Sequence, residues 1–164
     1  MTPDSQPPAG EGPPVFDRVS EMPGHLLRRC QQIAVSVFLD ECRVHDLTPL
    51  QFAVLATLMQ SGPLDQVGIS GCIALDRTTV SVVVRNLEER GFVRREVSAK
   101  DRRSKPVFIT ETGERLVRRA LPAVEAAQER MLSPLNAGER RRFMHFLRKM
   151  ADGNNDESRA PLRG

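Results

Sequence analysis

The chain has 164 residues, the size of one ordinary domain, and 40% of them are apolar, which is enough for a hydrophobic core. With 27% charged residues and no apolar run near the roughly 20 residues of a membrane span, it is expected to be soluble, with no membrane segment. The formal net charge is only +3, so the distribution of the charges is more informative than their sum.

Both ends of the chain are predicted to be disordered tails. Residues 1–23 hold half of the twelve prolines and almost no apolar periodicity. They also lack the basic start and apolar stretch of a signal peptide, so we expect a cytoplasmic protein. Residues 152–164, "DGNNDESRAPLRG", are polar and irregular in the same way.

Three helices are predicted in the first half of the chain. Residues 24–44 space their apolar side chains at intervals of three and four, which indicates a helix with one apolar face. In "DLTPLQFAVLATLMQSG", Thr48 is a candidate N-cap, Pro49 suits the first helical position, and Gly62 lies beyond the end. A short helix follows in "PLDQVGISGCIAL", weakened by two glycines.

A strongly marked helix is predicted to begin after Asp76, a good N-cap residue. Val80, Val83, Val84 and Leu87 then line one face, and Gly91 takes the usual position after the last turn. Three consecutive β-branched valines disfavour this helix in isolation, so tertiary packing must hold it.

A hairpin and two more helices complete the predicted order. "FVRREV" and "KPVFIT" are rich in β-forming residues and flank a charged loop, and two apolar-faced helices follow from Glu111. A short helix followed by a capped helix makes a helix-turn-helix, and a hairpin directly after it makes the winged variety. The sequence therefore predicts a mainly α fold with a small β-hairpin wing.

Positive charge is concentrated around this hairpin. Residues 76–105 contain nine basic and five acidic side chains, a net charge of +4 that exceeds the charge of the whole chain. A localised basic region points to a polyanion as partner.

Several short motifs in this order resemble the MarR family of bacterial transcriptional regulators. They are "LTPLQFAVL", "LDRTTV", "LEERGFV", "DRR" and "ITETG", and the resemblance runs from about Leu26 to Met150. It implies a regulator, more often a repressor than an activator, that binds a palindromic operator in double-stranded DNA as a homodimer.

The resemblance also implies a division of labour along the chain. Residues 48–111 would form the winged helix-turn-helix DNA-binding domain, and residues 24–47 and 112–151 a helical dimerisation region. Three apolar-faced terminal helices around so small a winged core agree with this, because a dimer would bury them. The alternative is that they cover the core of a monomer.

The recognition helix is expected to read DNA with hydroxyl and guanidinium groups, which bond phosphates and base edges. The candidate contacts are Arg77, Thr78, Thr79, Ser81, Val82 and Arg85. Many family members carry a long basic residue where this chain has Val82. Valine cannot donate a hydrogen bond, so Val82 is expected to meet a thymine methyl group or to read nothing.

In the wing, the family pattern assigns Arg103 to the minor groove, whose negative potential attracts arginine. Asp101 would brace the tip by pairing with a nearby arginine or the loop backbone. The expected phosphate contacts are Arg94, Arg95, Lys100, Arg102 and Lys105.

Many relatives release DNA when a small anion, often an aromatic carboxylate or phenol, binds between the dimer helices and the winged domain. The candidate ligand residues here are His25, Arg29, Arg43 and His45, with Phe52 as an apolar wall. Each of the four polar residues is equally typical of a solvated or helix-capping side chain. The tryptophan used by the urate-responsive branch is absent.

Two alternative functions stay open. Cys30, with Arg28 and Arg29 beside it, is a candidate redox sensor, although the peroxide-sensing branch has its cysteine earlier and uses tyrosines, which this chain lacks. The simpler interpretation is that Cys30, Cys42 and Cys72 are buried small hydrophobes. A winged helix that binds proteins is the other alternative, although such domains normally lose the basic tip.

No enzyme is predicted. The sequence has no Ser-His-Asp pattern and no Gly-rich phosphate loop, and the three histidines show no ligand spacing with the cysteines. We therefore expect no catalytic residues, no metal site and no cofactor.

Overall fold

The fold is taken from a computed structural model that describes residues 19–96 and 105–163. Its elements confirm the predicted order of helices and the two-stranded hairpin. They are α2 (Pro23–Glu41), the 3-10 turn η1 (Arg43–His45), α3 (Pro49–Ser61), α4 (Gln66–Ile73), α5 (Arg77–Glu89), β1 (Val93–Arg95), β2 (Val107–Ile109), α6 (Glu111–Met131), α7 (Ala137–Gly153) and the 3-10 turn η2 (Asn155–Glu157).

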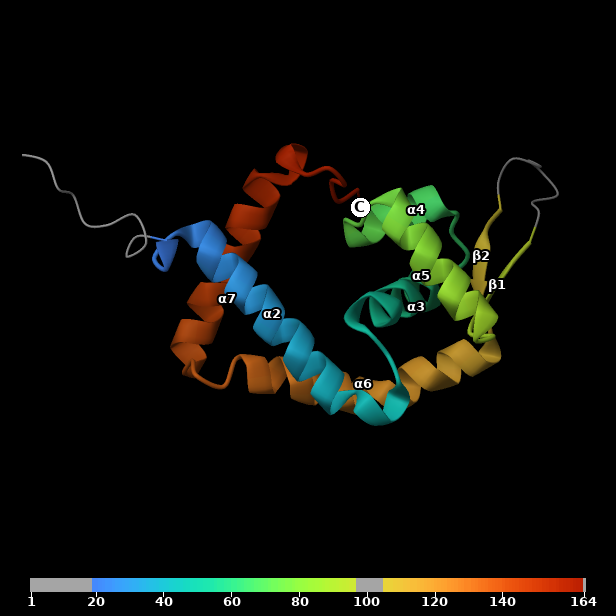
Figure 1. Cartoon of the computed structure of the whole chain (residues 1–164), viewed down its shortest axis with the longest axis horizontal. Helices are drawn as coiled ribbons and strands as arrows, with labels where there is room; N and C mark the ends of the chain where they lie inside the picture. Colours follow the sequence, from blue (N-terminus) through green and yellow to red (C-terminus); the bar gives the residue numbers. More distant parts are fainter. Residues whose placement is uncertain (1–18, 97–104, 164) are drawn as a thin grey trace, which may run out of the picture.

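The elements divide into two groups that α6 connects. In Figure 1, α3, α4, α5 and the hairpin lie together on one side, and α2 and α7 lie on the other. The long helix α6 runs beneath both groups, from the base of the hairpin to the turn before α7. Within the described ranges no single helix is long and apolar enough to cross a bilayer, and α4 and α5, bent by 111°, pass that test only as a pair.

The helix starts follow the residues that marked them in the sequence. Thr48 and Gln51 form a capping box at the start of α3: the Thr48 Oγ1 accepts the Gln51 N–H at 3.2 Å, and the Gln51 Oε1 accepts the Thr48 N–H at 3.0 Å. Asp65 caps α4 by accepting the Gly68 N–H at 2.8 Å. These local bonds satisfy backbone donors that the first turn leaves unpaired.

The buried side chains form two separate clusters. The winged-helix cluster unites α3, α4, α5, the hairpin and the first half of α6, and comprises Leu47, Val54, Leu55, Leu58, Ile69, Val80, Val83, Val84, Leu87, Val93, Val107, Leu116, Val117 and Ala120. The helical cluster joins the end of α2 to the second half of α6 through Phe38, Cys42 and Val124. Partly buried Phe52 packs against both clusters.

Two expectations about helix faces differ from the structure. The sequence spaces Leu50, Val54, Leu55 and Leu58 as one apolar stripe of α3, but Leu50 is 40% exposed while the other three are buried. Along α2 only Phe38 is buried, and the predicted apolar face from Leu26 to Ile33 lies open. Periodicity identifies an apolar face correctly but does not say which body covers it.

The wing is anchored to the end of the recognition helix. Strands β1 and β2 pair antiparallel with Val93 opposite Ile109, and Val107 also bridges to Leu64 before α4. The Arg95 Nε donates to the Glu88 Oε2 at 2.8 Å, its backbone N–H donates to Oε1 at 3.2 Å, and a second guanidinium nitrogen also bonds this carboxylate. The hydrogen bonds from Arg95 hold the pKa of the Glu88 carboxyl below its ordinary value.

The start of α6 crosses the base of the hairpin at very close range. Thr110 caps the helix by accepting the Gly113 N–H at 3.1 Å, and its own N–H donates to the Phe92 carbonyl at 3.0 Å. A Cβ at Gly113 would lie 2.3 Å from that carbonyl oxygen. The "ITETG" motif therefore has a physical basis, because threonine supplies the cap and only glycine leaves room for the crossing.

The prediction of a disordered C-terminal tail is wrong for residues 152–163. Helix α7 continues to Gly153, and the Asn155 side chain then bonds the backbone of Leu162 in both directions, at 2.8 and 3.2 Å. The Arg163 N–H donates to the Gly71 carbonyl at 2.9 Å, one of the carbonyls that the end of α4 leaves without a helical partner. Composition did not reveal these side-chain-to-backbone bonds. Residues 1–18 of the predicted N-terminal tail lie outside the described residues.

Replacing Gly113 by alanine should destabilise the protein by about 1–3 kcal/mol, because the added methyl group meets the Phe92 carbonyl and Ile109. Urea unfolding followed by circular dichroism measures this change. Gly153→Ala is the matched control, since a Cβ there meets nothing within 4 Å. Equal stability of the two variants would contradict the crossing.

The Glu88–Arg95 pair should make part of the stability depend on pH. Since the folded state lowers the pKa of Glu88, its contribution is complete above the ordinary value of 4.5 and is lost as the pH falls through the folded value. Both side chains are about one-third exposed, so the contribution is at most about 1 kcal/mol. Glu88→Gln should therefore be less stable than the parent at pH 7, and this difference should shrink as the pH falls below 4.5. Urea titrations across this range test it, with Glu89→Gln as the control, and a difference independent of pH would rule out the pair as its cause.

Candidate nucleic-acid interface and ligand pocket

The recognition helix α5 begins at a well-formed cap. The Asp76 Oδ1 accepts the Thr79 N–H at 2.9 Å, and its Oδ2 accepts the Thr79 hydroxyl proton at 2.6 Å. These two bonds hold the pKa of the Asp76 carboxyl below its ordinary value, and the bond from the Thr79 hydroxyl has the larger effect. Because a hydroxyl has one proton to donate, Thr79 can only accept a hydrogen bond from a ligand.

The two faces of α5 differ sharply. Val80, Val83, Val84 and Leu87 are buried in the winged-helix cluster, as the sequence predicted. All six predicted DNA contacts lie on the same helix: Arg77, Thr78, Val82 and Arg85 are exposed, and Thr79 and Ser81 are half-buried. The exposed face thus carries two cations, a hydroxyl and the half-exposed apolar Val82.

In the described part of the wing, two arginines form ion pairs within the protein. Arg94 pairs with Glu96 and stacks over the Phe108 ring at 4.6 Å, and Arg95 is bonded to Glu88. These pairs compete with the phosphate contacts predicted for Arg94 and Arg95. Lys105 is exposed. The predicted tip residues Lys100, Asp101, Arg102 and Arg103 lie outside the described residues.

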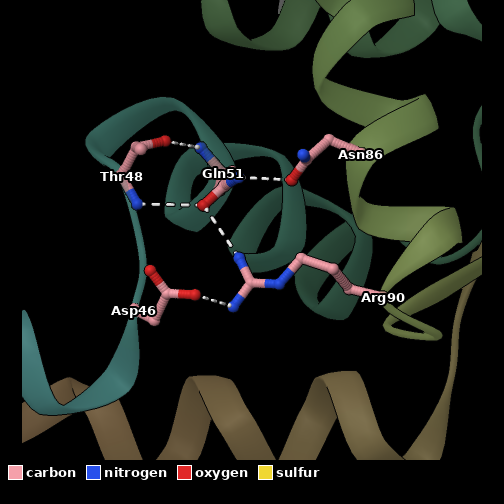
Figure 2. Close-up of polar contacts among 5 residues, drawn as sticks. All are labelled: Asp46, Thr48, Gln51, Asn86 and Arg90. Atoms are coloured by element: carbon pink, nitrogen blue, oxygen red, sulfur yellow. Dashed lines mark hydrogen bonds and ion pairs between the residues drawn. The ribbon is translucent and has the colours of Figure 1, made fainter.

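A polar network that sequence reasoning missed connects the start of α3 to the end of α5 (Figure 2). The Gln51 Nε2 donates to the Asn86 Oδ1 at 2.7 Å, and the Arg90 Nη1 approaches the Gln51 Oε1 at 3.4 Å. The other guanidinium nitrogen of Arg90 bonds the Asp46 carboxylate at 2.9 Å. We call Asp46, Thr48, Gln51, Asn86 and Arg90 the Arg90 network. The Thr-x-x-Gln spacing of the capping box is visible in the sequence. The other bonds of the network join residues far apart in the chain: Gln51 and Asn86 are separated by 35 residues, and Asp46 and Arg90 by 44.

A small pocket of about 130 Å³ lies where α2, α3 and α6 meet. Its walls are Gln31, Ala34, Val35, Phe38, Pro49, Ala127, Gln128 and Met131. The wall is mostly apolar, with the two glutamine amides as its polar groups. Such a site suits a small ring that bears one or two hydrogen-bonding substituents.

This pocket falls in the region predicted for a ligand but uses different residues. Phe52 packs against Phe38 with ring centroids 6.1 Å apart, so it supports the wall from behind. The other four predicted residues lie outside the wall: His25 and Arg29 near the start of α2, Arg43 and His45 in η1. The glutamines escaped prediction because an uncharged amide on a helix carries no distinctive sequence signal.

The three cysteines have different environments. Cys42 is buried in the helical cluster, and burial raises the pKa of its thiol. Cys72 is half-buried, and Cys30 is exposed on α2, so the expectation of a buried cysteine is confirmed for Cys42 and wrong for Cys30. Within residues 19–96 and 105–163, no group of three His, Cys, Asp or Glu side chains is arranged to hold a metal ion.

Comparisons with known proteins agree with this architecture. A model of the MarR family matches residues 47–105, the winged helix-turn-helix. The HTH-type transcriptional repressor NicR of Pseudomonas putida is 34% identical over 136 residues, which are 83% of this chain and 86% of NicR.

Solved structures of similar proteins extend the agreement to the whole fold. BpsR of Bordetella bronchiseptica, whose DNA binding is regulated by 6-hydroxynicotinic acid, superposes with a TM-score of 0.79 at 35% identity, covering 86% of this chain and 99% of BpsR. The repressor CouR of Rhodococcus jostii, bound to a 23-mer DNA duplex, superposes with a TM-score of 0.76 at 28% identity, covering 83% of this chain and 96% of CouR. With its capped recognition helix and anchored hairpin, the chain belongs to the MarR family of winged helix-turn-helix transcriptional regulators.

Proposed function

We propose that this protein is a repressor that binds a palindromic operator as a homodimer and releases it when a small aromatic acid binds. The observation that carries the proposal is the capped helix α5, which buries one face and presents Arg77, Val82 and Arg85 on the other. That face lies beside a hairpin, and residues 76–105, which include α5 and β1, carry a net charge of +4.

The chemistry of α5 suits the major groove. Exposed Arg85 can make a bidentate contact to guanine, and half-exposed Val82 can pack on a thymine methyl group. Arg77 and Thr78 at the helix start suit phosphates, because the backbone N–H groups there also favour anions. In the wing, Arg103 would enter the minor groove with Asp101 as its brace, and Lys100, Arg102 and Lys105 would contact phosphates. Arg95 would contribute less, since Glu88 already neutralises it.

The exposed apolar surfaces support a dimer. Helix α7 has no buried residue, although Phe143, Phe146 and Met150 are 39%, 62% and 39% exposed. Leu27 and Ile33 on α2 are exposed as well. A second copy of the chain would cover these side chains, whereas in one chain they do not cover its core, which disfavours the monomer alternative.

The pocket supports a single-ring effector. Its volume of about 130 Å³ is close to that of cavities of about 150 Å³ that hold benzene. The amides of Gln31 and Gln128 offer both donors and acceptors for ring substituents. BpsR is regulated by 6-hydroxynicotinic acid, an aromatic acid of this size, so that compound is the natural first probe.

Arg103→Ala should weaken operator binding about tenfold or more while the protein remains a folded dimer, because a minor-groove contact and one positive charge are lost in each half-site. Fluorescence polarisation with a palindromic duplex selected from random DNA measures the affinity at several salt concentrations. The slope of log K against log salt should fall by about two, one for each subunit of the dimer. Arg142→Ala, on α7 at the far end from the hairpin, is the matched control.

Several outcomes would count against this function. Full operator affinity of Arg103→Ala would contradict the assignment of the wing. Failure of the parent protein to select any duplex, or a shallow salt slope, would favour a protein-interaction module instead. Size-exclusion chromatography with light scattering decides whether the parent is a dimer.

The probe 6-hydroxynicotinic acid should lower operator affinity and raise the unfolding temperature, since it stabilises the state that binds it. Gln128→Leu should weaken this response about tenfold, because the ring substituents lose a hydrogen-bond partner. Gln32→Leu, one residue from the pocket wall on α2, is the control and should respond like the parent. Equal responses from all three proteins would place the effector elsewhere.

A further inference from the structure

The two hydrophobic clusters are joined by the chain at two narrow places. Between α2 and α3, Cys42 belongs to the helical cluster and Leu47 to the winged-helix cluster. Along α6, Ala120 belongs to the winged-helix cluster and Val124 to the helical one. The winged domain can therefore turn as a unit relative to the dimerisation helices only if both connections yield.

Each connection holds a residue that suits a pivot. Asp46 ends η1 in the left-handed conformation with a φ of 48°, which aspartate and asparagine tolerate better than most residues. Pro122 lies inside α6, where it cannot donate the helical hydrogen bond to the carbonyl of Arg118. Asp46 leaves the regular backbone and Pro122 removes one hydrogen bond from a continuous helix, both between the two hydrophobic clusters.

Arg90 spans the first of these pivots. Arg90 is the C-cap residue of α5. Its guanidinium bonds Asp46 at 2.9 Å and Gln51 at 3.4 Å (Figure 2). Its guanidinium carbon lies 4.9 Å from the centroid of the Phe92 ring, and its side chain is only 26% exposed. Gln51, in the first turn of α3, also donates a hydrogen bond to Asn86, which lies one helical turn before Arg90 in α5. These hydrogen bonds connect three segments: the linker between η1 and α3 (residues 46–48), the start of α3, and the end of α5.

We propose that Arg90 is a positioning residue that fixes the angle between the recognition helix and the dimerisation helices. By holding Asp46 to the end of α5, it restricts rotation about the pivots at Asp46 and Pro122. This inference rests on the proposed function, because the angle matters when two α5 helices of a dimer must reach two half-sites at one spacing.

The same junction contains the pocket. Pro49, which follows the linker directly, is the wall residue contributed by α3, and the other wall residues belong to α2 and α6. A ring in the pocket would touch both sides of the linker. The Arg90 network is therefore the set of bonds that an occupant of the pocket would strain when it displaces the start of α3.

The test is how strictly the protein selects half-site spacing. One inserted base pair rotates one half-site by roughly 35° about the duplex axis, so a rigid dimer should bind the shifted operator about tenfold more weakly. We expect the parent to show this loss. Arg90→Met keeps an apolar side chain of similar length but removes the guanidinium and its bonds to Asp46 and Gln51, and it should lose threefold or less. The probe is the selected palindrome with one base pair inserted or deleted at its centre.

Two further variants separate positioning from general damage. Asp46→Asn tolerates the same left-handed backbone and removes the charge, and since this side chain is 91% exposed the protein should fold normally. It should relax the spacing preference in the same direction as Arg90→Met. Arg115→Met breaks the exposed pair with Glu111 within α6 and should select spacing like the parent.

The outcomes distinguish this inference from the proposed function. A parent that selects no palindrome contradicts the function itself. A parent that selects a palindrome but accepts both spacings equally contradicts a fixed angle. A strict parent with equally strict Arg90→Met and Asp46→Asn variants contradicts the role of Arg90 alone.

Discussion

The packing of one face of α5 is the contact on which the rest of the structure depends. Val80, Val83, Val84 and Leu87 are buried where α5 packs against α3, α4 and β1, and this burial holds a helix whose run of valines is poorly suited to form alone. The same contact decides which side chains face outward. The caps of α3, α4 and α5, the anchored hairpin and the crossing of α6 are all arranged around it.

Features encoded by neighbouring residues could be predicted from the sequence. Thr48 and Asp76 cap their helices as expected, Gly91 has the positive φ of 73° that a helix end favours, and the face of α5 follows its periodicity. Each depends on residues within one or two turns, so a single sequence contains the information. The resemblance to the MarR family added the winged arrangement of the hairpin beside the helix-turn-helix.

Features that depend on distant partners could not be predicted in this way. Gln51 finds Asn86 across 35 residues, Arg90 finds Asp46 across 44, and the C-terminal segment returns to Gly71. The pocket illustrates the same limit, because Gln31 and Gln128 meet only when α2 and α6 pack together. Sequence reasoning favoured charged residues as ligands, whereas the fold brings two neutral amides to the pocket.

The close crossing at Gly113 makes the hairpin and α6 move together. The Phe92 carbonyl lies where any side chain at Gly113 would stand, and it also accepts the Thr110 N–H, so the foot of the hairpin and the first turn of α6 are locked backbone to backbone. The first turn of α6 therefore cannot move relative to the base of the hairpin. Any tilt of α6 about its middle is therefore carried to the hairpin, enlarged by the length of the strands.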